Sequence, residues 1–111
     1  TRKDFLGFLK FCSCIVGNSS AGLLEAPSFK KPAINIGRRQ NLRVRGKNVL
    51  DCSFTEASIT KSVKIGVSEN FNKKLKLIKN PYGNGRSAEK ILNILQNTKI
   101  NDKLLIKTLT I

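Results

Sequence analysis

The run from residue 14 to residue 27 constrains the fold more than any other part of the chain. Cys14-Ile15-Val16 is a short apolar run typical of a buried strand, and Gly17 permits a tight turn directly after it. Ser19 or Ser20 is then a favoured N-cap for the residues that follow. The run therefore predicts a strand that passes through a polar turn into a helix.

Such a turn is suited to binding phosphate. Backbone N–H groups without helical partners, serine hydroxyls and the positive end of the helix dipole meet at one place. The turn matches neither the GxGxxG pattern of dinucleotide-binding folds nor the GxxxxGK[ST] pattern of P-loops. Two interpretations of the turn alone therefore remain, a phosphate site and an ordinary capped helix after a strand.

A second strand is predicted from Lys31 to Gly37, after a helix of about two turns, and a helix from Asp4 to Phe11 precedes the first strand. The strand, helix and strand form a βαβ unit, whose parallel strands end at the same edge of the sheet. Ligands of open α/β sheets bind at that edge. We therefore expect residues 17–20 and 37–39 to face each other across one crevice.

The loop after the second strand is strongly basic. Guanidinium groups suit bidentate recognition of phosphate, so the loop and the serine turn point independently to an anionic ligand. The alternative is a solvated basic loop in a Lys/Arg-rich chain. The cations of the loop are Arg38, Arg39, Arg43, Arg45 and Lys47.

Further elements are expected after the basic loop. Val49 to Asp51 predicts a third strand, and Thr55 is placed to cap a helix that ends near residue 67. A basic helical segment follows over residues 71–78, and the proline and glycines of residues 80–85 demand a turn. Ser87 is expected to cap the next helix. Its apolar face should pack in the core and consists of Ala88, Ile91, Leu92 and Leu95.

Several of these stretches together resemble one family. They are Gly17-Asn18-Ser19-Ser20-Ala21-Gly22 with Glu25-Ala26-Pro27, Asn35-Ile36-Gly37 with Arg39-Gln40, Arg43 and Asn48-Val49, and Asn80-Pro81-Tyr82-Gly83-Asn84-Gly85. Their order and spacing, from about Asp4 to Leu95, resemble the carboxyl-terminal part of the UDP-N-acetylglucosamine 2-epimerases. The sequence of these motifs is more similar to that of the hydrolysing branch, which makes N-acetylmannosamine or a related sugar for sialic-acid-type biosynthesis.

The resemblance implies two Rossmann-like domains in a GT-B arrangement. We expect an α/β fold, part of a Rossmann-like parallel sheet with flanking helices, with residues 1–97 a partial UDP-binding domain and residues 98–111 a tail. Near the end of the chain, residues 97–103 resemble a linker and Leu104 to Lys107 form a last apolar patch. Because 111 residues make one small domain, we expect a fragment whose partner is a missing N-terminal domain. A homo-oligomer of the full-length protein is a further alternative.

The resemblance also implies a set of UDP-binding residues. Ser19 and Ser20 would bind the diphosphate, Glu25 would accept hydrogen bonds from the ribose hydroxyls, and Arg39 would lie near the nucleotide. A solvent-exposed helix charge is the alternative interpretation of Glu25. Asn41 stands where the family often has glycine, and asparagine is a good replacement at a positive φ. The full set is Ser19, Ser20, Gly22, Glu25 and Arg39, with Asn18 and Arg43 as further candidates.

The chemistry implied by the family needs groups that this chain lacks. The reaction expels UDP by elimination across C1 and C2 of the sugar and then adds water to the glycal, which requires acids and bases near the sugar ring. The chain has no histidine and seven carboxylates. We therefore expect the catalytic residues outside it. A UDP-sugar binding module without chemistry and the donor half of a GT-B glycosyltransferase remain as alternatives.

The composition of the chain bears on nucleic-acid, membrane and metal binding. The formal charge of +14 is compatible with nucleic-acid binding, but the lysines are dispersed and aromatics are few, so we expect no nucleic-acid partner. No apolar run approaches a membrane span, and we expect no membrane association. Three cysteines without histidine indicate reduced packing residues in a cytoplasmic protein, with no metal and no cofactor.

Overall fold

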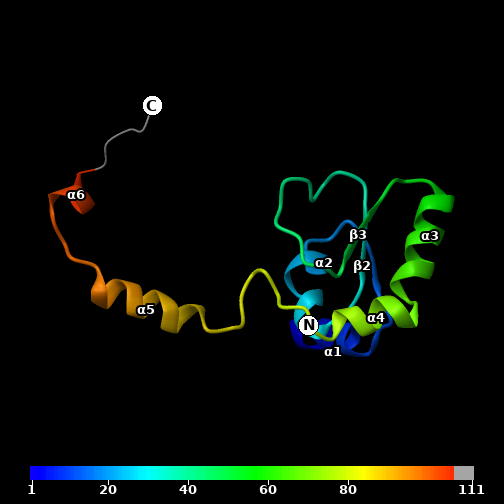
Figure 1. Ribbon diagram of the computed structural model, residues 1–111, viewed down its shortest axis with the longest axis horizontal. Helices are drawn as coiled ribbons and strands as arrows, with labels where there is room; N and C mark the ends of the chain where they lie inside the picture. Colours follow the sequence, from blue (N-terminus) through cyan, green and yellow to red (C-terminus); the bar gives the residue numbers. More distant parts are fainter. Residues whose placement is uncertain (107–111) are drawn as a thin grey trace.

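The computed structural model describes residues 1–106. Its centre is a parallel three-stranded sheet of order β1-β2-β3 (Figure 1). The strands are β1 (Ile15–Gly17), β2 (Ala33–Ile36) and β3 (Val49–Cys52). Gly17 pairs with Asn35, and Asn35 pairs with Asp51. The predicted α/β class and the parallel arrangement are confirmed.

The described residues also form helices along the chain. They are α1 (Arg2–Phe11), α2 (Ala21–Leu24), the 3₁₀ helix η1 (Ala26–Phe29), α3 (Glu56–Gly66), α4 (Glu69–Leu75), α5 (Ser87–Asn97) and α6 (Asp102–Leu105). A Cβ on Gly22 of α2 would lie 3.1 Å from Cβ of Ala33, and a Cβ on Gly66 of α3 would lie 3.0 Å from Cδ1 of Ile34. Successive strand residues point to opposite faces. Helices α2 and α3 therefore cover opposite faces of β2.

Apolar burial is concentrated around the central strand. Leu9, Ala26 and Ala33 form the buried core cluster on the α2 side. On the other face, Ile34 and Leu75 are almost completely buried. Thr55 caps α3 by accepting from the N–H of Ser58, as predicted. The core therefore fixes β2 and, with it, the loops at its carboxyl end.

The helix after β1 is shorter than predicted. Helix α2 has four residues, and the chain continues as the four-residue 3₁₀ helix η1. Pro27 lies in the first turn of η1 and has no N–H to donate to the carbonyl four residues earlier. A continuous α-helix of two turns is therefore excluded, and the prediction was wrong on this point.

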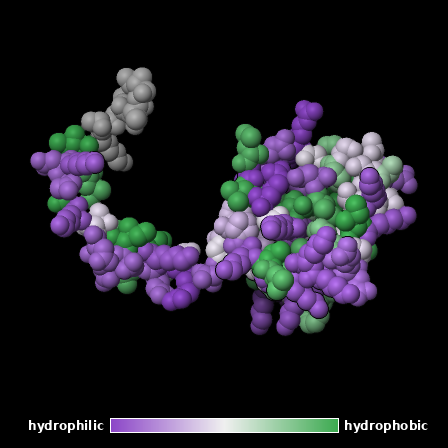
Figure 2. Space-filling view, in the orientation of Figure 1, coloured by the Kyte–Doolittle hydropathy of each residue, from purple (hydrophilic) through white to green (hydrophobic). Residues whose placement is uncertain are grey.

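The expectation that α5 packs in the core was also wrong. Helix α5 extends away from the sheet, and none of its residues is buried (Figure 1). Figure 2 shows hydrophobic side chains at the surface of α5, next to hydrophilic ones. The helix starts at Ser87 itself with Arg86 at the N-cap. The exposed apolar residues of α5 include Ile91, Leu92, Ile94 and Leu95.

Other boundaries shift for local reasons. The helical segment expected over residues 71–78 is α4, which starts earlier because the Ser68 hydroxyl accepts from the N–H of Phe71. The expected linker contains the start of α6, where Asn101 caps the N–H of Leu104. Of the predicted tail, residues 107–111 lie outside the described residues.

Candidate functional site

The loops after β1 and β2 meet at one edge of the sheet, as predicted. Gln40 lies in the second loop, and its Nε2 donates to the carbonyl of Asn18 in the first at 2.8 Å. The Gln40 side chain is buried, with 3% of its surface exposed. The parallel register of β1 and β2 sets the two loops side by side. The serine turn and the basic loop therefore form one continuous surface.

A cavity of about 310 Å³ lies beside this surface. Gly17, Asn18 and Ser19 form its rim, Phe5 of α1 contributes an aromatic side chain, and Asn35 contributes a carboxamide. A broader depression of about 740 Å³ follows the outer face of α3. It lies along one helix, and none of the predicted site residues lines it. The cavity beside the serine turn is therefore the better ligand site.

The backbone donors of the turn are used differently from the prediction. Ser19 Oγ accepts from the N–H of Ala21 at 3.2 Å, and the N–H of Gly22 donates to the carbonyl of Ser19 at 3.3 Å. The N–H groups of Leu23 and Leu24 both donate to the Ser20 carbonyl. Helix α2 therefore has few orphan donors at its start. Since it is four residues long, it also has a small dipole.

The serine hydroxyls remain available to a ligand. Ser20 is the N-cap of α2, yet its side chain makes no capping hydrogen bond. Ser19 Oγ accepts one hydrogen bond, but a hydroxyl also carries a proton that it can donate. Among residues 1–106, no acceptor is recorded for the N–H groups of Ser19 and Ser20. The turn can therefore donate from two hydroxyls and two amides.

Glu25 is not the solvent-exposed helix charge of the alternative interpretation. It lies at the junction of α2 and η1, and 21% of its side chain is exposed. Its Oε1 accepts a long hydrogen bond of 3.5 Å from Nη1 of Arg2. Its Oε2 is buried and has no donor among the described residues. A buried carboxylate oxygen without a donor is costly, so this atom is free to accept a further hydrogen bond.

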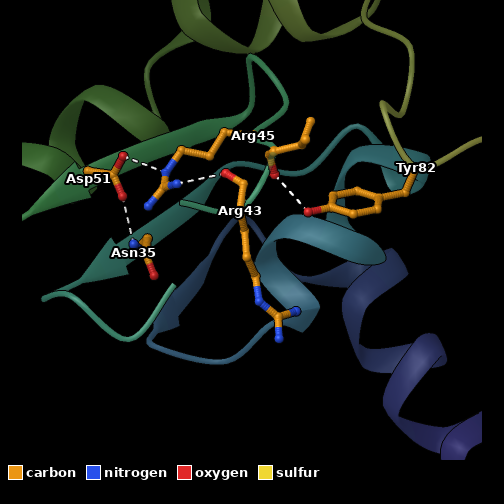
Figure 3. Close-up of polar contacts among 6 residues, drawn as sticks. Asn35, Arg43, Arg45, Asp51 and Tyr82 are labelled. Atoms are coloured by element: carbon orange, nitrogen blue, oxygen red, sulfur yellow. Dashed lines mark hydrogen bonds and ion pairs between the residues drawn. The ribbon is translucent and has the colours of Figure 1, made fainter. Parts of the chain in front are cut away.

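The cations of the basic loop fall into two groups. Arg39 and Arg43 are exposed, and no hydrogen bond or ion pair of either guanidinium is recorded within residues 1–106. Arg45 is bound internally: its Nε donates to Oδ2 of Asp51 at 2.8 Å. Figure 3 shows the Arg43 side chain extending away from Arg45 and Asp51. Arg39 and Arg43 are therefore available to an anion, and Arg45 is not.

The positive φ in this loop occurs one residue later than predicted. Leu42, and not Asn41, adopts a φ of 65°. Leucine rarely adopts this conformation because its Cβ crowds the following carbonyl. The Leu42 side chain is fully exposed and packs on nothing. The conformation must therefore be imposed by contacts that other residues of the loop make with the rest of the structure.

Sequence reasoning missed the polar contact between the two strands that flank the basic loop. Asn35 Nδ2 donates to Asp51 Oδ1 at 2.6 Å, and the two residues pair directly across β2 and β3. Phe5, which lines the cavity, was not among the predicted site residues. The available signal was a buried asparagine inside an otherwise apolar strand, because buried polar side chains need partners.

The cysteines lie apart from this chemistry. Cys12, Cys14 and Cys52 are free and partly buried. Burial raises the pKa of the Cys14 thiol, and the neighbouring Cys12 adds to the increase, so Cys14 has less thiolate than an exposed cysteine. Within residues 1–106 there is no cluster of three histidine, cysteine or acidic side chains that could hold a metal ion. No helix among the same residues is long and apolar enough to cross a membrane.

Comparison with known proteins gives consistent matches. Residues 1–96 match the family model described as UDP-N-acetylglucosamine 2-epimerase. The UDP-N,N'-diacetylbacillosamine 2-epimerase (hydrolyzing) of Legionella pneumophila is 35% identical over 106 residues, which are 96% of this chain and 27% of that protein. The polysialic acid biosynthesis protein P7 of Escherichia coli is 40% identical over 80 residues, 72% of this chain and 20% of that protein. The chain thus spans about a quarter of the length of such relatives.

Proposed function

The chain belongs to the UDP-N-acetylglucosamine 2-epimerase family, and on that premise we propose that it supplies the UDP-binding wall of a hydrolysing UDP-sugar 2-epimerase. Residues 1–97 would form part of the UDP-binding domain of a longer protein. One observation carries the proposal: the hydrogen bond from Gln40 to the Asn18 carbonyl joins a serine turn to a loop whose exposed arginines, Arg38, Arg39 and Arg43, have no side-chain partner within residues 1–106. Hydroxyl and guanidinium donors converging on one edge suit a diphosphate.

In this proposal the two loops share the diphosphate. The hydroxyls and N–H groups of Ser19 and Ser20 donate to its oxygens, and Asn18 lies on the same rim. Arg39 and Arg43 supply positive charge from the facing loop. Gly22 lines the same cavity, and its missing Cβ also allows α2 to pack against Ala33. These groups also stabilise the charge that develops on UDP as it leaves the sugar.

We propose that Glu25 binds the ribose. Its buried Oε2 has no donor among the described residues, and a ribose hydroxyl would provide one. The acids and bases that act on the sugar ring would come from parts of the enzyme outside this chain. This chain therefore contributes binding, orientation and charge stabilisation, which is the part of catalysis that positions a substrate.

Glu25→Gln tests the ribose contact. In the full-length enzyme we expect the variant to bind UDP roughly 10-fold more weakly, because a hydrogen bond to a charged acceptor contributes about 1.5–3 kcal/mol and glutamine retains part of it. Titration calorimetry with UDP and with 2',3'-dideoxy-UDP provides the measurement. The variant should bind the dideoxy analogue about as well as the parent enzyme does. An equal loss for both ligands would show that Glu25 does not act through the ribose.

A further inference from the structure

We propose that Arg45 and Tyr82 are positioning residues, which hold the loop of residues 38–47 in the shape that directs Arg43 to the diphosphate. The inference rests on the proposed UDP site and adds two residues to it. Neither residue would contact UDP. Each would act on the backbone that carries Arg43.

The loop has little support of its own. Its internal backbone hydrogen bonds include Asn41 N–H to the Arg38 carbonyl at 2.9 Å and Arg43 N–H to the Gln40 carbonyl at 3.4 Å. Leu42, between these donors, is fully exposed and has an unfavourable φ of 65°. Unfavourable backbone conformations persist only where the surrounding structure determines them. Contacts outside the loop must therefore hold it.

Arg45 provides one such contact. Its Nε donates to Asp51 Oδ2 at 2.8 Å, and its Nη1 donates to the carbonyl of Arg43 at 2.9 Å. The other oxygen of Asp51 accepts from Asn35, which is 2% exposed in the central strand. Figure 3 shows this chain of contacts from the sheet to the Arg43 backbone. The planar guanidinium reaches both acceptors at once.

Tyr82 provides a second contact from the other side. Its hydroxyl donates to the carbonyl of Val44 at 2.9 Å (Figure 3). The turn that carries Tyr82 is itself tied to the α2 region, because Asn80 Nδ2 donates to the Leu24 carbonyl at 2.8 Å and to Ser28 Oγ at 2.7 Å. This contact gives a structural role to residues 80–85, which the sequence analysis predicted as a turn and used in the family resemblance.

The two contacts hold consecutive carbonyls, those of Arg43 and Val44. The backbone of Arg43 is therefore fixed, while its guanidinium has no recorded partner among the described residues. A cation held in place before binding loses less conformational freedom when the ligand arrives. Arg45 and Tyr82 should thus increase affinity for the diphosphate through Arg43.

The test uses the full-length enzyme and calorimetric titration with UDP. We expect Arg45→Gln to weaken binding about 10-fold and Tyr82→Phe about 3-fold, within the range for charged and neutral hydrogen bonds. Arg45→Lys keeps the charge but replaces the rigid planar fork by a single ammonium group, which does not reproduce the separate Nε and Nη1 contacts, so it should lose nearly as much as Arg45→Gln. Lys47→Gln removes one charge from the same loop, and because its ammonium makes no hydrogen bond or ion pair within residues 1–106, it should change affinity less than 2-fold. Circular dichroism checks that each variant is folded.

The same substitutions in an Arg43→Ala background separate positioning from general stability. If Arg45 and Tyr82 act through Arg43, their substitution in that background should change UDP affinity less than 2-fold, because residues that act together are not additive. Losses that add to the loss from Arg43→Ala would overturn the inference, as would parent-like binding by Arg45→Gln or Arg45→Lys. In both cases UDP binding by the parent would leave the proposed function standing. A parent enzyme that does not bind UDP would overturn both.

Discussion

Arg39→Ala should weaken UDP binding to the full-length enzyme by roughly 1.5–3 kcal/mol, the range for a hydrogen bond to a charged group. Arg39 is exposed and directly precedes Gln40, whose side chain is hydrogen-bonded to the serine turn at 2.8 Å. The backbone of Arg39 is thereby held next to the proposed phosphate surface. Titration calorimetry with UDP measures the loss.

Arg38→Ala is the matched control, because it removes the same charge from the adjacent exposed position. It should reduce affinity by less than half as much in free energy if Arg39 contacts the diphosphate. Equal losses of affinity for the two variants would indicate that both arginines act only through general electrostatic attraction of the anion. If Arg39→Ala weakened binding of random-sequence oligonucleotides as strongly as binding of UDP, the nucleic-acid interpretation would be favoured.

Leu23→Ala should destabilise the sheet domain by about 2–5 kcal/mol, the usual cost of truncating a fully buried leucine. Leu23 is 0% exposed and anchors α2, the helix that begins at the serine turn. Native-state hydrogen exchange in the full-length enzyme gives the opening free energy of β2 and so reports on this domain alone. Leu77→Ala, at a leucine that is 88% exposed, should change that free energy by less than about 0.5 kcal/mol. Similar effects of both substitutions would contradict the assignment of Leu23 to the core.

The sheet was predictable because short apolar runs and helix-capping residues, which are local features of the sequence, determine it. The three apolar runs gave the strands to within one or two residues, and Thr55 capped its helix as expected. The length of α2 depends on one residue, Pro27, whose effect on the helix was overlooked. The expectation of free N–H donors at the start of α2 was wrong for a related reason. In a helix of one turn, nearby acceptors satisfy these N–H groups.

The remaining differences depend on what lies far away in sequence. An amphipathic pattern shows that α5 has an apolar face, but it does not show what covers that face, and α5 is exposed. The contacts of Asp51 with Asn35 and Arg45 depend on the register of two strands. The hydroxyl of Tyr82 reaches a carbonyl 38 residues earlier in the chain. Contacts of this kind follow from the assembled fold and not from the spacing of residues.

Hydrogen–deuterium exchange of the full-length enzyme with and without UDP tests the central claim most directly. Bound diphosphate should protect backbone amides that now have no acceptor, including those of Ser19 and Ser20. We therefore predict slower exchange in the presence of UDP over residues 18–22 and residues 38–43, with little change over α3. Protection confined to α3 or α4, with unchanged exchange in both loops, would contradict the account.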